Sequence, residues 1–304
     1  MDRIVIVKKK TSLDELIEQH MTYIAAKFYL KSLEQTIDPY EAEDKTYKAA
    51  VEMIRSKLPS DIQVTSVERQ DLPNFLFRNS DLVIVCGPDG LFVNLAQYIE
   101  EQLVITVNPD PKTVTGALML FRPDEVGEVV KNIQTGKHKS EALPFIKASL
   151  GIDKVLWGLN DILIGRKDPV SARYNISFNG RSENQSSSGI LVSTGTGSTG
   201  WMKSIQAMVD GIIQQGRTHK LSYLPERTEK ELVFVVREPF LLPNTGVSIV
   251  TDRIFPGKPL IVHSQMPTGG YIFSDGIVEK GLIWNAGETV TISVGDRFIH
   301  RIVR

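Results

Sequence analysis

The feature that most constrains this 304-residue chain is a change of hydrophobic pattern near Phe121. Before that point, short apolar runs alternate with segments of helical periodicity. Strands separated by helices predict a mainly parallel sheet covered on both faces. After it, many short strand-like runs are separated by turn signals such as NG, PGKP and TGG, which predict an antiparallel, sandwich-like β domain. The sequence therefore predicts an α/β domain over residues 1–121 and a β-rich domain over residues 122–304, and we allow for the last segment returning to the first domain.

Composition narrows the class of protein. The 35 basic and 36 acidic side chains nearly cancel, so no bulk field favours nucleic acid or an anionic membrane. The single cysteine, Cys86, cannot form an intrachain disulfide and fits a reducing compartment. No apolar run approaches the length of a transmembrane span. We therefore expect a cytoplasmic protein that binds neither nucleic acid nor membrane.

The residues after the first strand-like run carry a helical pattern. Ser12 with Glu15 predicts a capping box, and apolar residues follow at helical spacing. These apolar residues are Leu13, Leu16, Ile17, Ile24 and Phe28. Pro39 is expected to end this helix, and a second helix then runs to about Leu58.

A first candidate site follows the apolar run VIVC. Gly87, Pro88, Asp89 and Gly90 form a turn signal, and an amphipathic segment starts at Leu91. In open parallel sheets, ligands bind outside the carboxyl ends of the strands. The start of the next helix favours anions at that place. The alternative is that Asp89 only caps the helix.

A second candidate site is the run TGTGSTGW, which ends at Trp201. A strand leads into this run and a helix follows it, and its glycines and hydroxyls expose donors that suit phosphate or ribose. Gly195, Gly197 and Gly200 match the G-x-G-x-x-G of dinucleotide-binding folds. The β-rich sequence on both sides argues against that fold. The acidic residue that would bind the ribose, at the end of a strand about 20 residues later, is also missing. A tight strand-to-helix connection is the alternative.

Asn160 and Asp161 form a third candidate, because they interrupt an otherwise strand-like run. Adjacent residues in a strand point to opposite faces, so at least one of them is expected to meet the core or a cleft. A turn at an edge is the alternative. The five histidines show no ligand spacing, so we expect no metal site built from protein side chains.

Taken together and in this order, the three stretches resemble the NAD kinase family over most of the chain. GPDG occupies the position of the family's G-G-D-G motif. LND corresponds to its Asn-Glu pair, and TGSTGW corresponds to its T-G-S-T-A-Y loop. The likeness is closer to the mitochondrial-type NAD kinases of animals, through VNPDPKTVTG, the SSG…TGTGS loop and VVREP at Arg237. FSDG at Ser274 is similar to the family's late DG turn.

The resemblance implies transfer of the ATP γ-phosphate to the adenosine 2′-hydroxyl of NAD, with magnesium accompanying ATP, in a homo-oligomer. It implies a site in the cleft between the two domains, where Asp89 is the base and Asn160 and Asp161 hold the ribose of NAD. The residues that would bind the nucleotides are Gly87, Gly90, Asn160, Asp161, Ser188, Thr196, Thr199, Gly200 and Trp201.

Four positions depart from the family pattern. In the first motif, Pro88 stands for glycine and Leu91 for threonine. Asp161 stands for glutamate, and Ser188 stands where many members have aspartate. Two other functions therefore stay open: a catalytically silent relative that binds a dinucleotide, and a kinase for another hydroxyl acceptor.

Overall fold

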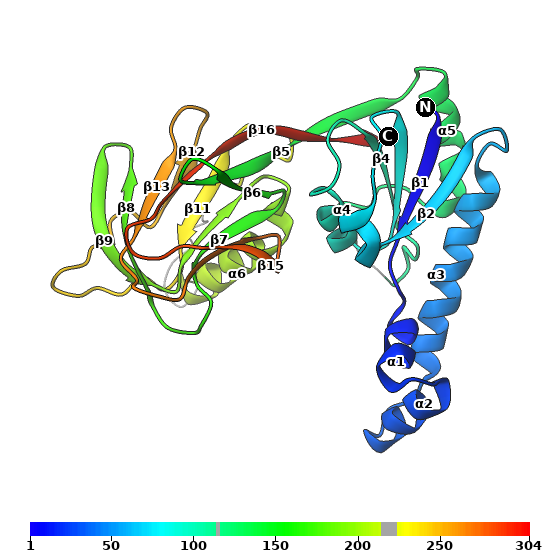
Figure 1. The fold of residues 1–304 in the computed structure, drawn as a ribbon, viewed down its shortest axis with the longest axis horizontal. Helices are drawn as coiled ribbons and strands as arrows, with labels where there is room; N and C mark the ends of the chain where they lie inside the picture. The colour runs from blue at the N-terminus through cyan, green and yellow to red at the C-terminus, as the bar shows by residue number, and fades with distance from the viewer. Residues whose placement is uncertain (114–115, 214–223) are drawn as a thin grey trace. The chain divides into compact units, whose positions relative to one another are not determined.

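The computed structural model describes residues 1–113, 116–213 and 224–304 and divides into two compact units. Unit 1 comprises residues 1–141 and 299–304, and unit 2 comprises residues 142–298. The chain passes between the units within two long strands, β5 (Lys139–Leu150) and β16 (Thr289–Val303), which Figure 1 labels. Phe121, the predicted boundary, lies inside unit 1. A division of function between the units stays a prediction.

Unit 1 is built on a parallel sheet. β1 (Arg3–Lys8) lies between β2 (Gln63–Glu68) and β3 (Asp81–Cys86), and β4 (Leu103–Val107) follows beside β3. The end of β16 adds a further parallel strand next to β4. The other elements of this unit are α1 (Ser12–His20), α2 (Tyr23–Ser32), α3 (Asp38–Lys57), η1 (Arg69–Asn74), α4 (Asp89–Leu95), η2 (Pro123–Glu125) and α5 (Val126–Gln134).

Two helices cover one face of this sheet. The buried side chains of Ile4 and Ile6 in β1 share a cluster with Ile54 of α3 and Val130 of α5. All six residues of β3 are buried, as expected for a strand between two covered faces. The carboxyl ends of β1, β3 and β4 lie at the same edge, where the GPDG turn follows β3.

The single helix predicted after β1 is in fact two helices. Thr11 caps α1 and forms a capping box with Asp14, one position before the predicted Ser12 and Glu15. Met21, with φ of 68°, ends α1 in the left-handed conformation, and α2 starts two residues later. Pro39 lies in the first turn of α3, where a missing N–H is tolerated.

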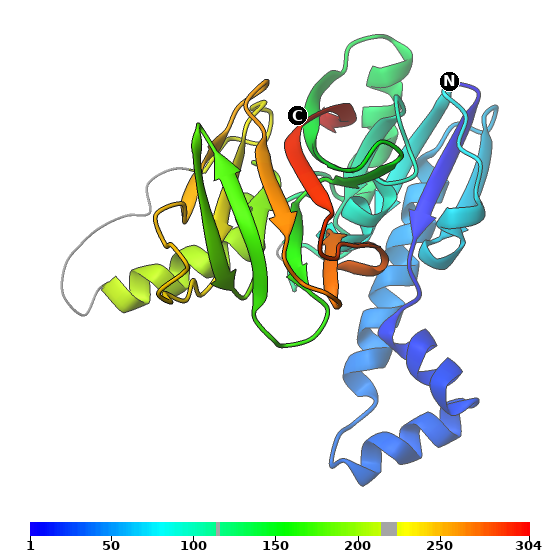
Figure 2. The same ribbon diagram turned by 60° about the vertical axis from the view of Figure 1, so that its left-hand side comes forward.

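Unit 2 is an antiparallel sandwich. One sheet has the order β12-β11-β10-β7-β14-β15, and the other continues from β16 through β13 and β8 to β9. Buried residues of both sheets, including Tyr174 and Phe234, form one core. Figure 2 shows the strands of this unit from a second side. The fold class predicted from the sequence is thus confirmed. The bounds in this unit are β6 (Lys154–Gly158), β7 (Asp161–Arg166), β8 (Ala172–Phe178), β9 (Arg181–Ser187), β10 (Ile190–Ser193), η3 (Gly197–Thr199), α6 (Trp201–Ile213), β11 (Leu232–Val236), β12 (Thr251–Ile254), β13 (Leu260–Ser264), β14 (Gly270–Ser274) and β15 (Ile277–Ile283).

The predicted helix that starts near Gly200 is α6, and the two glutamines at its predicted end lie outside the described residues. Within the part of the chain that the structure describes, none of the helices has the length and apolar character needed to cross a membrane.

Candidate functional site

Asp89 lies where β3 gives way to α4. It is the first residue of the helix, and Pro88 occupies the cap position before it. The Asp89 carboxylate instead accepts two backbone hydrogen bonds, from the N–H of Ala117 to Oδ2 (2.9 Å) and from the N–H of Leu118 to Oδ1 (3.0 Å). The alternative that Asp89 only caps the helix is therefore wrong. Because an ionised carboxylate accepts about four hydrogen bonds, each oxygen keeps acceptor capacity for a substrate hydroxyl.

The loop that holds Asp89 is itself fixed by the last strand of unit 1. The carbonyl oxygen of Leu118 accepts a hydrogen bond from Arg301 Nη1 (2.8 Å) and another from Thr106 Oγ1 (2.8 Å). The Arg301 side chain is buried and pairs with Glu141. Sequence reasoning missed Arg301. Its one signal in the sequence is an arginine among the apolar residues of FIHRIVR.

The glycines of the GPDG turn have different surroundings. A Cβ added to Gly87 would lie 2.8 Å from Leu91 Cδ2, whereas one added to Gly90 would meet nothing within 4 Å. A pocket of about 480 Å³ opens next to Pro88. Its lining consists of Lys9, Pro39, Ala42, Glu43, Thr46, Tyr47, Pro88, Pro109, Asp110 and Thr113.

Asn160 and Asp161 lie in unit 2, where the chain passes from β6 to β7. Asn160 is in the bend and Asp161 starts β7, so a turn interrupts the apolar run. The carboxylate of Asp275 accepts hydrogen bonds from the backbone N–H groups of Leu159 (2.9 Å), Asn160 (2.8 Å) and Asp161 (3.2 Å). Asp275 belongs to the late DG turn, so this turn clamps the bend between β6 and β7.

The carboxyl group of Asp161 is buried. Burial, and secondly the negative charge of Asp275, raise the pKa of Asp161 to about 7. A carboxyl group with such a pKa can both donate and accept a hydrogen bond near neutral pH. This combination suits contact with a hydroxyl group of a ligand.

The glycine-rich loop packs directly against the Asn160 bend. The hydroxyl of Thr194 donates to the carbonyl of Leu159 (2.6 Å) and accepts the N–H groups of Thr196 (3.1 Å) and Gly197 (3.2 Å). A Cβ on Gly197 would lie 2.2 Å from the Asn160 carbonyl oxygen, so only glycine fits there. β10, which leads into the loop, pairs antiparallel with β7 and β11. This pairing excludes the parallel dinucleotide-binding fold, as the sequence argument expected.

Two buried oxygen atoms of this bend and loop have no hydrogen-bond partner among the residues that the structure describes. Among the described residues, neither Asn160 Oδ1 nor Thr196 Oγ1 has a partner, and both atoms are buried. A buried polar atom left unpaired costs about 1–3 kcal/mol. The bend and the loop therefore hold unused hydrogen-bonding capacity that a polar ligand could satisfy.

The remaining predicted residues lie around the start of α6. Ser188, Thr199 and Gly200 are exposed, and Trp201 is half-buried. The guanidinium of Arg237 lies 5.1 Å from the centroid of the Trp201 ring, and the Arg237 carbonyl accepts the N–H of Ser188 (2.9 Å). Trp201 also packs on the apolar cluster beneath α6. Both expectations for Trp201, a core residue and a ligand contact, remain compatible with this position.

The predicted residues thus form two clusters, one in each unit. Gly87, Asp89 and Gly90 lie in unit 1, and the others lie in unit 2. Sequence reasoning missed two groups of unit 2 that shape its cluster: the Thr194 hydroxyl, and the carboxylate of Asp275 as a clamp. Over residues 1–113, 116–213 and 224–304, no group of three metal-binding side chains comes together.

Solved structures share this architecture. Yeast NADH kinase complexed with NADH superposes with a TM-score of 0.62 over 99% of this chain and 83% of that chain, at 14% identity. An NAD kinase from Archaeoglobus fulgidus in complex with ATP gives a TM-score of 0.59 over 98% and 92%, at 17% identity. The chain has the NAD kinase fold. The resemblance to that family is confirmed, and the likeness to the mitochondrial type stays a prediction.

A curated NAD kinase also matches part of the sequence. The NAD kinase of Methanoregula boonei (strain DSM 21154 / JCM 14090 / 6A8) is 33% identical over 131 residues, which are 41% of this chain and 46% of that protein. The chain thus spans less than half the length of this relative. No family model matches the sequence.

Proposed function

We propose that this protein transfers the γ-phosphate of ATP to the 2′-hydroxyl of the adenosine ribose of NAD and so forms NADP. The observation that carries the proposal is Asp89, placed at the carboxyl end of β3 in an NAD kinase fold and oriented by two backbone N–H groups. The names of the relatives, an NAD kinase, an NADH kinase with NADH and an NAD kinase with ATP, support these substrates.

Asp89 is the proposed base. The 2′-hydroxyl oxygen attacks the γ-phosphorus, Asp89 takes the hydroxyl proton, and ADP leaves. Phosphoryl transfer depends on positioning and charge stabilisation more than on covalent help, so a fixed carboxylate is sufficient. Ala117 and Leu118 fix its orientation, and Arg301 acts through Leu118 as a positioning residue.

ATP is proposed to bind beside the GPDG turn, where Gly87 and Gly90 let its phosphates approach the backbone. Lys9, which lines the pocket next to Pro88, would place a positive charge near them. Magnesium binds proteins through one or two carboxylates plus substrate phosphates, which fits an ion carried in with ATP rather than held by a cluster of side chains.

Unit 2 is proposed to hold NAD. Asn160 and Asp161 would bind the adenosine ribose, and Thr196, Thr199, Gly200 and Trp201 would surround the adenine and its ribose, with Ser188 nearby. The unpaired Asn160 Oδ1 and Thr196 Oγ1 support this assignment, as does the raised pKa of Asp161. We further propose a homo-oligomer, and a cytoplasmic location because the single cysteine is buried and reduced.

A catalytically silent relative is the second candidate, and Pro88 favours it because proline has no N–H to offer a phosphate. A coupled assay separates the two. The purified full chain is incubated with NAD, ATP and magnesium, and NADP is measured with an NADP-specific dehydrogenase. We expect NADP to accumulate only when ATP is present. NAD binding in calorimetry without NADP formation would support the silent relative. ADP formation that requires an added hydroxyl compound in place of NAD, above the rate of ATP hydrolysis by water, would indicate another hydroxyl acceptor.

A further inference from the structure

Two backbone segments beside the GPDG turn separate at the carboxyl end of the sheet in unit 1. β1 and β3 pair in register up to Val7 and Val85. Beyond this pair, Lys9 follows β1, and Cys86 ends β3 and leads into the turn. On the side of β4, the turn is held by the Gly87 N–H, which donates to a carbonyl of that strand (3.2 Å). On the side of Lys9, the support comes from outside the sheet.

The Tyr47 hydroxyl bridges these two segments. It accepts a hydrogen bond from the Lys9 N–H (2.9 Å) and donates one to the Cys86 carbonyl (2.8 Å). Tyr47 belongs to α3, is 5% exposed and shares the apolar cluster of unit 1. Burial raises the pKa of Tyr47 well above its usual value, so the hydroxyl keeps its proton and can donate and accept at once. One hydroxyl group of a helix thus joins the ends of two strands.

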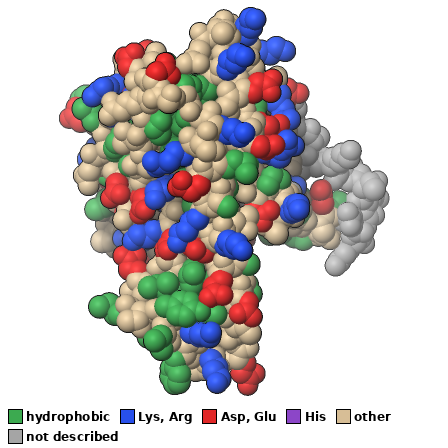
Figure 3. All heavy atoms as spheres, turned by 90° about the vertical axis from the view of Figure 1, so that its right-hand side faces the viewer, with side chains coloured by type: hydrophobic (Ala, Val, Ile, Leu, Met, Phe, Trp, Pro, Cys, Tyr) green, Lys and Arg blue, Asp and Glu red, His purple; other side chains and the backbone are tan. Residues whose placement is uncertain are grey.

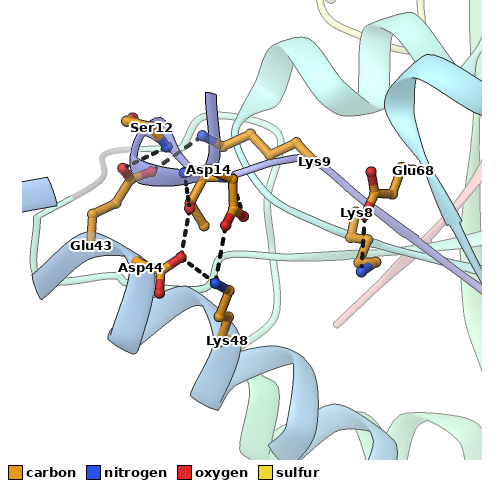
Figure 4. A network of polar contacts seen from close by, with 9 residues as sticks. Lys8, Lys9, Ser12, Asp14, Glu43, Asp44, Lys48 and Glu68 are labelled. Atoms are coloured by element: carbon orange, nitrogen blue, oxygen red, sulfur yellow. Dashed lines mark hydrogen bonds and ion pairs between the residues drawn. The ribbon is translucent and has the colours of Figure 1, made fainter. Parts of the chain in front are cut away.

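The same helix also holds the side chain of Lys9. The ammonium nitrogen of Lys9 lies 3.2 Å from Glu43 Oε1 and 5.9 Å from the centroid of the Tyr47 ring. Figure 4 shows Lys9 reaching Glu43, whose other oxygen accepts the N–H of Ser12 (3.2 Å). Lys9 is therefore fixed at its backbone by Tyr47 and at its ammonium group by Glu43.

These groups meet at one pocket of unit 1. Lys9, Tyr47 and Pro88 all line the cavity of about 480 Å³ beside the GPDG turn. The chain carries 35 basic and 36 acidic side chains, and Figure 3 shows both signs intermixed over the face that it presents. Because no bulk positive field attracts an anion, its binding at this pocket depends on how individual groups such as Lys9 are placed.

We propose that Tyr47 is a positioning residue of the phosphate-donor site. Its hydroxyl fixes Lys9 and the GPDG turn relative to each other, so that the ammonium group and the turn contact the same triphosphate. Phenylalanine at this position would keep the ring in the core and remove the bridge, so the role belongs to the hydroxyl. The inference rests on the ATP site of the proposed function and names the residue that sets its geometry.

Calorimetric titration of the full chain with ATP and magnesium, without NAD, tests the proposal. We expect Tyr47→Phe to raise the dissociation constant for ATP by about ten-fold or more, because a hydrogen bond to a charged group is worth at least that factor. The KM for ATP should rise in parallel while the KM for NAD stays unchanged, which a general loss of stability would not produce. Circular dichroism checks folding.

Tyr174→Phe is the matched control for this substitution. Tyr174 is fully buried in unit 2, and its hydroxyl is hydrogen-bonded to Gln185 and Ser187. The control variant should lose stability and keep the ATP affinity of the wild type. Equal losses of ATP affinity in the two variants would overturn the inference.

A double-mutant cycle shows whether Tyr47 acts through Lys9. Lys9→Gln removes the ammonium group, and we expect it to weaken ATP binding by about ten-fold as well. In the Lys9→Gln background, Tyr47→Phe should add at most about three-fold, since both changes disrupt one arrangement. Two independent losses that multiply to about 100-fold would overturn the inference.

Hydrogen exchange of the Lys9 amide gives a readout that needs no ligand. Its N–H is bonded to the Tyr47 hydroxyl, so Tyr47→Phe should speed its exchange by about ten-fold or more, and Tyr174→Phe should not. Unchanged exchange in a folded Tyr47→Phe protein would show that the hydroxyl does not hold Lys9, and the inference would fail.

These measurements keep the inference apart from the proposed reaction. A wild type that binds ATP without forming NADP would refute the reaction, and weaker ATP binding by Tyr47→Phe would still support the inference. A wild type that forms NADP, with a folded Tyr47→Phe variant of unchanged ATP affinity, would refute the inference and leave the reaction standing. A wild type that binds no ATP would overturn both.

Discussion

The two clusters of candidate residues differ in how their polar groups are satisfied. In unit 1, each oxygen of Asp89 already accepts a backbone N–H. In unit 2, the side-chain oxygens of Asn160 and Thr196 lack partners among the described residues, and Asp161 is buried next to the charge of Asp275. A hydrogen-bonded group is held in one orientation. A buried group without a hydrogen bond raises the free energy of the folded, ligand-free protein, and a ligand that bonds to it removes this cost. The first cluster is thus suited to orient a reacting group, and the second to gain hydrogen bonds on binding.

The glycines show the same contrast. A Cβ added to Gly90 of the first cluster would meet nothing within 4 Å. A Cβ added to Gly195 or Gly197 of the second would lie 2.0 Å from the Glu226 carbonyl oxygen or 2.2 Å from that of Asn160. Glycine in the first loop lets a ligand approach the backbone. In the second loop it lets one backbone segment approach another, so that loop is a rigid part of the fold.

The largest effect is expected for Asp89→Asn, which removes the proposed base. Turnover should fall by about 100- to 10,000-fold, the usual contribution of a general base. One of the two backbone N–H groups loses its acceptor, so the unfolding free energy should also fall, by about 1–3 kcal/mol. The measurements are the rate of NADP formation at saturating substrates and a urea titration.

Asp124→Asn is the matched control for this substitution. Asp124 is an exposed carboxylate of unit 1 that pairs with Arg122, far from the GPDG turn in sequence. The Asp124→Asn substitution should leave turnover unchanged. An Asp89→Asn protein with nearly wild-type turnover would end the assignment of the base.

Gly197→Ala and Gly90→Ala test the contrast between the two loops. The new methyl group at position 197 would lie 2.2 Å from a backbone oxygen, so we expect a loss of about 3 kcal/mol of stability or more, together with weaker NAD binding. Gly90 lies in α4 with nothing within 4 Å, so alanine there should stabilise the protein by up to about 1 kcal/mol. Thermal midpoints of both variants are compared with the wild type. Equal effects would show that the two loops do not differ as described.

Sequence patterns predicted the parts of this molecule that depend on neighbours along the chain. Alternation of apolar runs with helical segments predicted the parallel sheet of unit 1, and short runs with turn signals predicted the antiparallel sheets of unit 2. The glycine-rich loop was assigned between a strand and a helix, where β10 and α6 place it. These features follow from local hydrogen bonding and side-chain periodicity.

Contacts between distant segments could not be predicted in this way. Asp275 clamps Asn160 from 115 positions away, and Arg301 holds Leu118 from 183 positions away. The break between α1 and α2 was also missed, because the helical spacing of apolar residues continues across Met21. Spacing predicts which residues share a face of a helix, but only the tertiary structure shows whether anything covers that face.

Asp161→Asn tests the electrostatics of the second cluster. The folded-state pKa of Asp161, about 7, lies above its unfolded value of about 3.9. Between these two pH values the carboxyl group is protonated in the folded protein and ionised in the unfolded chain. The contribution of the protonated Asp161 to the unfolding free energy is fully present below about pH 4. It falls as the pH rises from about 4 to about 7 and is lost above that. Asparagine imitates the neutral acid. The variant should nearly match the wild type at about pH 4 and exceed it by about 4 kcal/mol at about pH 8 in urea titrations, because the two pKa values differ by about 3 units and each unit corresponds to about 1.4 kcal/mol.

The difference between the two pH values is the decisive result for Asp161. A constant difference at both would mean that Asp161 is ionised throughout, and burial beside Asp275 would not control its protonation. NAD affinity of the same variant, measured at the lower pH, reports separately on the ribose contact.

Trp201→Ala separates a ligand contact from a core residue. An indole that stacks on a base should contribute about 1–3 kcal/mol to NAD binding. Trp157→Ala is the matched control, because the Trp157 ring has Lys147 Nζ at 5.3 Å, as Trp201 has Arg237, but it belongs to no candidate cluster. Calorimetry with NAD and thermal midpoints are compared. If both variants lose only stability, Trp201 is part of the core and the adenine pocket lies elsewhere.

The smallest effect is expected at Pro88, where the family pattern has glycine. Pro88 has φ of −76° and ψ of 165°, which most residues adopt without strain. The turn therefore needs no left-handed residue here, and the physical difference is the missing N–H. A hydrogen bond from that N–H to an ATP phosphate would contribute about 1.5–3 kcal/mol, because one partner is charged. Pro88→Gly should then raise kcat/KM for ATP by about ten-fold or more.

Pro88→Ala distinguishes the donor from the added freedom of glycine. Alanine restores the N–H at the same φ, whereas glycine also loosens the unfolded chain, at a cost of about 0.4–1 kcal/mol. If the donor is what the loop lacks, both variants gain rate for ATP at saturating NAD, and alanine gains at least as much as glycine. A gain with glycine alone would mean that bound ATP requires a positive φ at this position. If both variants fold and neither gains rate, the missing N–H is not what limits the reaction. That result would support the catalytically silent relative, in which no phosphate binds at this turn.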